Sequence, residues 1–239
     1  MLSYMTLPRA IEGRALLERI PVFAGLSRRD LDLLHGITGT RRLRAREVLF
    51  RKGDEGATLY GVMRGRLRVF SGADAKEVIL NFLDPGEVFG EIALLDAQPR
   101  SATIAAVEPV ELLTLQRRDF LPFIEQHPKV AIQLATALAQ RLRTLSDAVE
   151  DAMLLSIPGR LAKKLLALAQ SYGKPAAGGT RIDLKLPQHQ LGELVGATRE
   201  SVNKHMRAWT AAGVIRVERG FITLLDEEAL EAAAGYALL

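Results

Sequence analysis

The sequence predicts an α+β protein in which a strand-rich half is followed by one long helix and a smaller helical domain. Short apolar runs between turn residues fill 41–115, which is typical of an antiparallel sandwich or barrel. A stretch without Pro or Gly covers 129–155 and predicts the long helix. We therefore expect an N-terminal domain at 1–128, a linking helix at 129–155 and a C-terminal domain at 156–239.

The composition is that of a globular protein with a buried core. The chain has 239 residues, of which 48% are hydrophobic and 25% are charged. No apolar run approaches the roughly 20 residues of a membrane span, and the N-terminus lacks the apolar stretch of a secretory signal. Without Cys, the chain has no disulfide, no thiolate metal site and no cysteine-ligated iron–sulfur cluster. We expect a cytoplasmic protein without a metal or a membrane partner.

Basic residues are concentrated in the C-terminal part of the chain. The net charge is only +4, but residues 156–225 carry 11 Lys and Arg against 4 acidic residues. Residues 1–155 are balanced, with 21 basic and 20 acidic side chains. A basic block in a balanced chain indicates a polyanionic partner, and a solvated basic surface is the alternative.

The apolar runs of the first half are predicted as strands. Turn residues such as those at 53–56 and 84–86 separate them. Ahead of the strands, Ser27 is placed to cap a helix at 28–34, and 1–20 is predicted as a short helical lead-in. The predicted strands are 48–50, 59–63, 67–70, 78–83 and 110–115.

The long helix carries an apolar seam whose residues alternate steps of three and four, as positions a and d do in a two-stranded coiled coil. We interpret the seam as the interface of a parallel homodimer; a core helix lying on the sheet is the alternative. The helix ends at 156–159, a candidate hinge, because Ser156 is a good N-cap and a first helical turn tolerates Pro158. The seam consists of Ala135, Leu138, Leu142, Leu145, Val149 and Ala152.

The segment after the hinge begins the C-terminal domain. Its pattern predicts an amphipathic helix at 160–172, a loop at 173–179 and a short strand at 181–184. At the far end of the domain, an acidic helix is expected from Asp226 onward.

Residues 186–207 match a helix-turn-helix, in which Gly196 supplies the left-handed turn residue and Thr198 caps the second helix. Basic side chains can donate to guanine and Glu can accept from cytosine, so the polar face of this helix predicts a contact with double-stranded DNA. A hairpin at 214–224 follows as a wing and offers Arg216 and Arg219 to phosphates. An αα corner is the alternative. The polar face presents Arg199, Glu200, Asn203, Lys204 and Arg207.

The stretch 89–103 has the residues of an anion site. Its backbone can offer successive N–H groups, from Gly90, Glu91, Ile92 and Ala93. Arg100 can neutralise a phosphate, Ser101 adds a hydroxyl, and Glu91 can accept from a ribose hydroxyl. An internal ion pair between Arg100 and Glu91 is the alternative interpretation.

This stretch resembles the phosphate-binding cassette of cyclic-nucleotide-binding domains, and residues 21–225 resemble the bacterial CRP/FNR transcription regulators. The second helix of the helix-turn-helix matches that family at 198–204. The resemblance implies a jelly-roll effector domain, a long dimerisation helix and a winged DNA-binding domain. It also implies a homodimer on a palindromic TGTGA-like site, with RNA polymerase as a partner.

The resemblance implies that Gly90, Glu91, Arg100 and Ser101 contact the cyclic phosphate and ribose, and it places Arg141 near the ligand. Two consecutive polar residues of the long helix read the adenine in relatives that bind cyclic AMP. The matching positions are Leu145 and Ser146, so only Ser146 is polar. Cyclic AMP is the expected effector; cyclic GMP, cyclic di-GMP, another effector or a ligand-independent regulator are the alternatives.

An enzyme is not expected. The four His are scattered without metal-ligand spacing, and the chain has no Gly-x-Ser-x-Gly or P-loop pattern. The motifs present are those of a sensor and a DNA-binding module.

Overall fold

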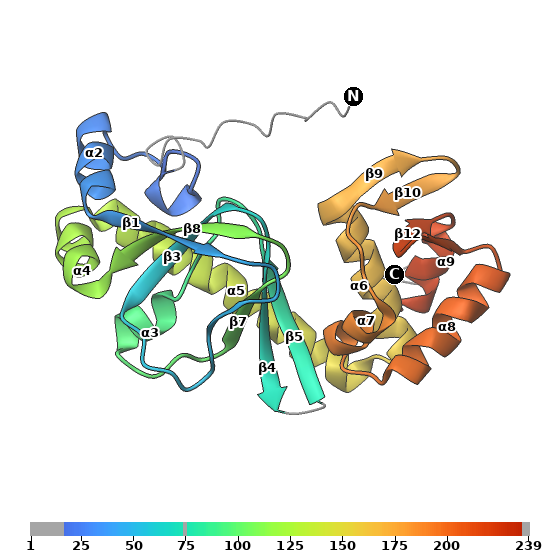
Figure 1. The fold of residues 1–239 in the computed structure, drawn as a ribbon. Coiled ribbons are helices and arrows are strands. Elements are labelled where there is room, and N and C mark those ends of the chain that lie inside the picture. The colour runs from blue at the N-terminus through green and yellow to red at the C-terminus, as the bar shows by residue number, and fades with distance from the viewer. Residues whose placement is uncertain (1–16, 74–75, 236–239) are drawn as a thin grey trace, which may run out of the picture. The chain divides into compact units, whose positions relative to one another are not determined.

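The computed structural model describes residues 17–73 and 76–235, which form two compact units (Figure 1). The first unit contains the described residues up to Ser71 together with Leu80–Arg141. The second contains Gly72–Ile79, apart from the undescribed positions, and the described chain from Leu142 onward. Most of the lead-in expected at 1–20 lies outside the described residues.

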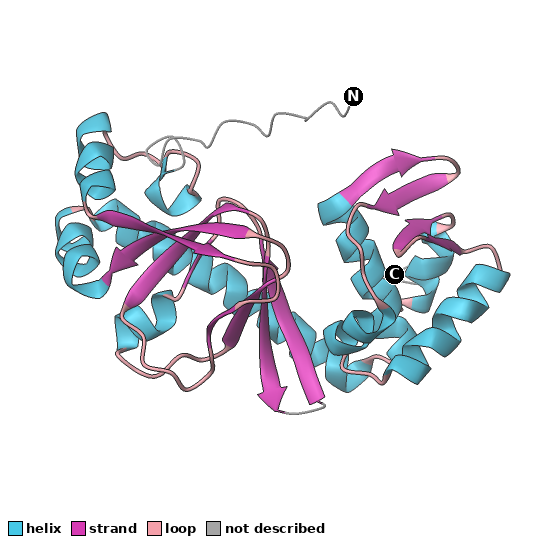
Figure 2. Ribbon diagram, viewed as in Figure 1, coloured by secondary structure: helices cyan, strands magenta, loops and turns pink. Residues whose placement is uncertain are grey.

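The strands of the first half form two four-stranded sheets within the described residues, with orders β1-β8-β3-β6 and β2-β7-β4-β5 (Figure 2). Neighbours such as β1 and β8, β3 and β8, and β4 and β7 are antiparallel. This arrangement confirms the predicted sheet-rich domain. The strands are β1 (Thr38–Leu43), β2 (Val48–Phe50), β3 (Thr58–Arg64), β4 (Leu67–Ala73), β5 (Lys76–Leu83), β6 (Val88–Phe89), β7 (Thr103–Ala106) and β8 (Val110–Gln116).

Two apolar cores stabilise this part of the chain. One draws on strands of both sheets and includes Val62, Leu67 and Leu112, which are fully buried. The other packs helices against the sheet and includes Leu34 and Phe120. The helical elements are η1 (Pro21–Phe23), α2 (Arg28–Gly36), α3 (Glu91–Asp96), α4 (Arg117–Gln126) and the long α5 (Pro128–Leu154).

The helix starts follow the predicted capping residues. The Ser27 hydroxyl accepts a hydrogen bond from the Asp30 N–H at 3.2 Å and begins α2. The Ser156 hydroxyl accepts from the Gly159 N–H at 3.4 Å and begins α6 (Ile157–Tyr172), with Pro158 in the first turn. The predicted break between the long helix and the next helix is therefore confirmed.

The second unit contains a further four-stranded sheet among its described residues, with the order β11-β12-β10-β9. The helix-turn-helix and the wing are present as predicted. The elements after α6 are β9 (Gly173–Ala176), β10 (Gly179–Ile182), α7 (Gln188–Val195), α8 (Arg199–Ala211), β11 (Ile215–Glu218), β12 (Phe221–Leu224) and α9 (Glu227–Ala233). Asp226 caps α9 by accepting from the Ala229 N–H at 2.9 Å, and positions 236–239 lie outside the described residues.

The prediction of a loop at 173–179 is wrong, because Gly173–Ala176 is strand β9, paired antiparallel with β10. All residues of β9 are exposed, so the strand carries no apolar alternation to reveal it. Pro175 is tolerated because β9 lies at the edge of its sheet. The strand expected at 181–184 begins and ends earlier, at Gly179–Ile182. No helix of the described residues is long and apolar enough to cross a membrane.

Candidate functional site

Arg100 is the buried cation of the cassette, with 5% of its surface exposed. Its Nη1 donates to the Gly90 carbonyl and its Nη2 to the Thr58 carbonyl, each at 3.0 Å. The guanidinium lies 4.2 Å from the centroid of the Phe50 ring. Its Nε is buried and has no hydrogen-bond partner in the structure. The bonded groups are neutral, so the guanidinium keeps its positive charge uncompensated by these bonds, and its Nε–H has no acceptor.

Burial lowers the pKa of the Arg100 guanidinium from its usual value, and Tyr60, Glu91 and Asp54 oppose this effect. An arginine nevertheless stays protonated in proteins. A buried cation is costly unless an anion compensates it. The arrangement therefore fits a ligand that brings a negative charge to Arg100.

Two glycines make room for this guanidinium. A Cβ at Gly56 would lie 2.1 Å from the Arg100 Nε, and a Cβ at Gly90 would lie 2.8 Å from the Arg100 Nη1. Gly90 also has a positive φ of 82°, which side-chain-bearing residues rarely adopt. Both positions therefore require glycine if Arg100 is to keep its place.

Gly56→Ala is expected to displace the Arg100 guanidinium while leaving the fold intact, because the φ of Gly56 is not positive. If one charge-assisted hydrogen bond to a ligand is lost, the affinity for the expected effector, cyclic AMP, falls by about tenfold. Titration calorimetry measures this change. Gly36→Ala is the matched control, because a Cβ at Gly36 meets nothing within 4 Å. Equal affinity for cyclic AMP in the two variants would contradict the placement of the ligand beside Arg100.

Glu91 is 2% exposed and forms an ion pair with Arg141 of α5. The Nη1 of Arg141 donates to the Glu91 carboxylate, and its Nη2 donates to the Val88 carbonyl. The alternative pairing of Arg100 with Glu91 is therefore not formed, because Arg100 bonds to backbone carbonyls instead. The structure brings Gly90, Glu91, Arg100 and Arg141 together.

The remaining predicted ligand residues differ in exposure. Ala93 is buried, whereas Ile92 and Ser101 are exposed. Ser146 is exposed on α5, and its hydroxyl donates to the Leu142 carbonyl of the same helix at 3.0 Å. A contact of Ser146 with a nucleotide base stays a prediction.

The predicted seam of α5 is apolar and open to solvent in the single chain. Leu142, Leu145 and Val149 are 65%, 49% and 59% exposed. Soluble proteins rarely expose a contiguous apolar stripe of this kind without a partner. The core-helix interpretation applies to the start of α5, where Val130 and Leu134 are buried in the apolar core of the first unit.

In the second unit, helix α8 has one side buried in the domain and one polar side exposed. The Thr198 hydroxyl caps the helix by accepting from the Ser201 N–H at 3.2 Å, and Gly196 has a φ of 63°. The buried side of α8 carries Val202 and Met206. Arg199, Glu200, Lys204 and Arg207 are exposed. Asn203 is half-buried and accepts from the Gln188 side chain of α7 at 3.1 Å, so its carbonyl oxygen is engaged within the motif.

Comparisons with known proteins match both units. A model of the cyclic nucleotide-binding domain matches residues 40–127, and a model of the Crp-like helix-turn-helix domain matches residues 159–233. The CRP-like cAMP-activated global transcriptional regulator of Mycobacterium tuberculosis is 33% identical over 77% of this chain and 82% of that protein. The chain belongs to the CRP/FNR family. It is a transcription regulator and not an enzyme.

Two other members of the CRP/FNR family are informative. The cyclic AMP receptor protein of Thermus thermophilus is 34% identical over 90% of this chain and 96% of that protein. The structure of CLP from Xanthomonas campestris, described as a c-di-GMP-responsive global regulator, has a TM-score of 0.75. The match covers 83% of this chain and 99% of the CLP chain, with 21% sequence identity. At this identity the similarity concerns the fold alone.

The wing of this CRP/FNR regulator is a tight hairpin. Arg219 and Gly220 form its turn, and both have positive φ, 52° and 84°. This is the geometry of a type I′ turn, in which a residue with a side chain is strained. Arg216 donates to the Ala177 carbonyl at 3.2 Å, so part of its guanidinium is engaged on the neighbouring hairpin.

The sequence interpretation missed Lys185. The Leu186 N–H donates to the Gly220 carbonyl of the wing at 3.2 Å, which holds Lys185 beside the wing turn. The Lys185 Nζ lies 5.5 Å from the Phe221 ring centroid. Lys185 belongs to the short link before α7, where no periodicity singles out a residue. The one sequence feature that could have indicated Lys185 is its position among the 11 basic residues of 156–225.

Proposed function

We propose that this CRP/FNR regulator binds cyclic AMP at Arg100 and that the nucleotide controls its affinity for DNA. The observation that carries the proposal is the buried Arg100, whose Nε lacks a partner and whose other bonds go to neutral carbonyls. A cyclic phosphate supplies the missing negative charge and accepts charge-assisted hydrogen bonds. Ser101 would add a hydroxyl to the same phosphate.

The ribose end of the nucleotide is assigned to Glu91. A ribose hydroxyl that donates to Glu91 competes with Arg141 for the same carboxylate, because the pair is formed in the structure. Ligand binding at the cassette is thereby connected to the helix α5. The base would approach Ser146, where the neighbouring Leu145 offers no polar atom.

The relatives support cyclic AMP as the nucleotide. The Mycobacterium protein is named cAMP-activated, and the Thermus protein is named a cyclic AMP receptor. Cyclic di-GMP is the second candidate, because Leu145 departs from the usual polar residue and the Xanthomonas regulator with this fold is described as responding to that dinucleotide.

Titration calorimetry with cyclic AMP, cyclic GMP and cyclic di-GMP tests the effector. We expect saturable binding of cyclic AMP and weaker binding of the other two. If cyclic di-GMP or cyclic GMP binds more tightly than cyclic AMP, that nucleotide is the effector and the assignment of cyclic AMP is wrong. The absence of heat from all three would contradict the sensor function itself.

The exposed stripe of α5 supports a homodimer, which is typical of this family. A dimer would place its two α8 helices on half-sites about 34 Å apart, one turn of DNA. The target would be a palindromic TGTGA-like sequence, with RNA polymerase as the partner at the promoter. Such a regulator works beside the chromosome, which supports the cytoplasm as its location.

The hinge after α5 offers a route from the ligand to DNA. In this proposal α6 and the helix-turn-helix rotate against the end of α5 at the capped break beside Ser156, and the Lys163–Asp151 ion pair across the break opens as they do so. A nucleotide shifts this equilibrium only by its different affinities for the two arrangements, a coupling of about 1–3 kcal/mol.

Arg199→Ala and Lys185→Ala are expected to weaken DNA binding in different ways. Loss of Arg199 removes a donor to a guanine edge and costs about 1–3 kcal/mol of discrimination at one base pair. Loss of Lys185 removes a phosphate contact, so it weakens specific and scrambled duplexes alike and lowers the salt slope by about one. Fluorescence anisotropy at several salt concentrations separates the two patterns. Unchanged discrimination in Arg199→Ala would contradict the assignment of α8 as the base reader.

A further inference from the structure

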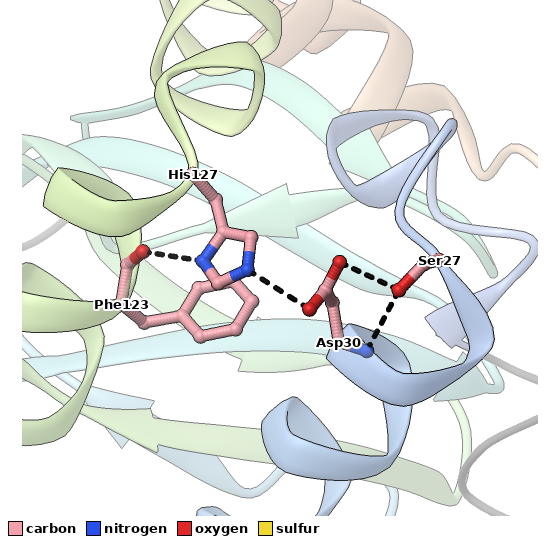
Figure 3. A network of polar contacts seen from close by, with 4 residues as sticks. All are labelled: Ser27, Asp30, Phe123 and His127. Atoms are coloured by element: carbon pink, nitrogen blue, oxygen red, sulfur yellow. Dashed lines mark hydrogen bonds and ion pairs between the residues drawn. The ribbon is translucent and has the colours of Figure 1, made fainter.

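A polar network joins α2 to the corner between α4 and α5 (Figure 3). His127 lies at this corner, directly before Pro128 of α5. The His127 Nε2 is 3.3 Å from the Asp30 carboxylate, and its Nδ1 is 2.8 Å from the Phe123 carbonyl. The other carboxylate oxygen of Asp30 accepts from the Ser27 hydroxyl at 2.7 Å.

Both ring nitrogens of His127 therefore face oxygen acceptors. A neutral imidazole carries one N–H, so it could satisfy only one of these acceptors and would turn a lone pair toward the other. The doubly protonated ring donates to both at once and places its charge against the Asp30 carboxylate. The geometry thus favours the imidazolium form.

The network is shielded from solvent on one side. The His127 and Asp30 side chains are 17% and 28% exposed, and the His127 ring stacks on Phe123 with 4.1 Å between ring centroids. Phe123 belongs to the apolar core that also contains Leu31 of α2 and Val130 of α5. The contact between His127 and Asp30 therefore lies beside the apolar core in which α2, α4 and α5 pack together.

Charged residues of both signs also lie close to His127 and Asp30 in the sequence. Glu125 precedes His127 by two residues on α4, and Lys129 follows it by two on α5. On α2, Asp30 faces the ring, and Asp32 lies two residues further along. The Ser27 hydrogen bond, followed by the contact with His127, lowers the pKa of Asp30, so this carboxylate stays charged in mildly acidic solution.

We propose that Asp30 and His127 form a pH-sensitive clamp that fastens α2 to the start of the long helix. The stabilisation requires a doubly protonated His127 ring, because only that form donates to both acceptors, and it is lost when the ring releases one proton. At the acidic end it is lost once Asp30 is protonated. Acidification of the cell interior would tighten the effector unit at the start of α5.

A double-mutant cycle on the full chain tests the clamp. The variants are Asp30→Asn, His127→Gln and the double substitution, and the unfolding equilibrium constant of each is measured by denaturant titration. We expect a coupling of roughly three- to tenfold between the two positions at a pH where the His127 ring is doubly protonated, and no coupling at a higher pH where the ring is neutral. Equal coupling at both pH values, or none at the lower pH, would overturn the proposal.

His35→Gln is the matched control, since His35 is exposed on the same helix as Asp30. Paired with Asp30→Asn, it is expected to show no pH-dependent coupling. Nitrogen-15 NMR of the unsubstituted chain gives a second readout that does not depend on how the variants fold. The ring signals of His127 identify the two pH values of the cycle, and a ring that is neutral at the pH where the coupling is present would contradict the clamp.

Discussion

Arg100→Ala is expected to lower the affinity for cyclic AMP by at least about 100-fold. The substitution removes the buried positive charge and its free Nε donor from the cassette. Hydrogen bonds to charged groups are each worth about 1.5–3 kcal/mol, and losing two of them accounts for a change of this size. Titration calorimetry with cyclic AMP measures the loss. Binding to non-specific DNA is expected to remain, because α8 and the wing are unchanged.

Arg68→Ala provides the matched control for this experiment. Arg68 also packs its guanidinium on an aromatic ring of the strand domain, 4.1 Å from the Phe70 centroid, but it lies outside the cassette. Its removal should leave the affinity for cyclic AMP unchanged. If the Arg100→Ala and Arg68→Ala proteins bind cyclic AMP equally well, the assignment of the anion site to Arg100 is wrong.

Leu142→Asp is expected to convert the proposed dimer to monomers. A buried Leu stabilises an interface by about 1.5–3 kcal/mol, and twofold symmetry makes each substitution act twice. The two introduced carboxylates would also lie close to one another across the seam, which adds repulsion. We expect a loss of at least about 1000-fold in dimer affinity, seen by sedimentation velocity, together with weaker binding to a palindromic site.

Leu33→Asp is the control for the dimer experiment. Leu33 is 56% exposed, comparable to the seam residues, but it lies on α2. It should change neither the sedimentation coefficient nor the DNA affinity. A Leu142→Asp protein that remains dimeric would show that the α5 stripe serves another contact.

The sequence predicted the parts of the fold whose signals are local. The five apolar runs are strands, and the caps at Ser27, Ser156 and Thr198 begin helices as expected. The cassette and the helix-turn-helix were found because their residue types follow one another in a short stretch. Other strands escaped prediction: β1 is mostly exposed and polar, and β9 is an exposed edge strand. The buried strands β6 and β7 were also missed, because they are only two and four residues long and flank the cassette.

The pairings between distant segments could not be predicted in the same way. Glu91 and Arg141 lie 50 residues apart, and only the packing of α5 against the cassette decides that they meet. The same applies to Lys185, which the hydrogen bond between Leu186 and Gly220 brings to the wing. Such contacts depend on tertiary packing, which residue spacing does not encode.

Control of DNA binding by cyclic AMP is tested by the affinity for a TGTGA palindrome, measured by fluorescence anisotropy with and without saturating cyclic AMP. A coupling of about 1–3 kcal/mol predicts that the nucleotide tightens DNA binding by roughly five- to 150-fold. The same titration with Arg100→Ala should show no change. Equal DNA affinity in the presence and absence of bound cyclic AMP would contradict the account, because the nucleotide would then occupy its site without controlling the regulator.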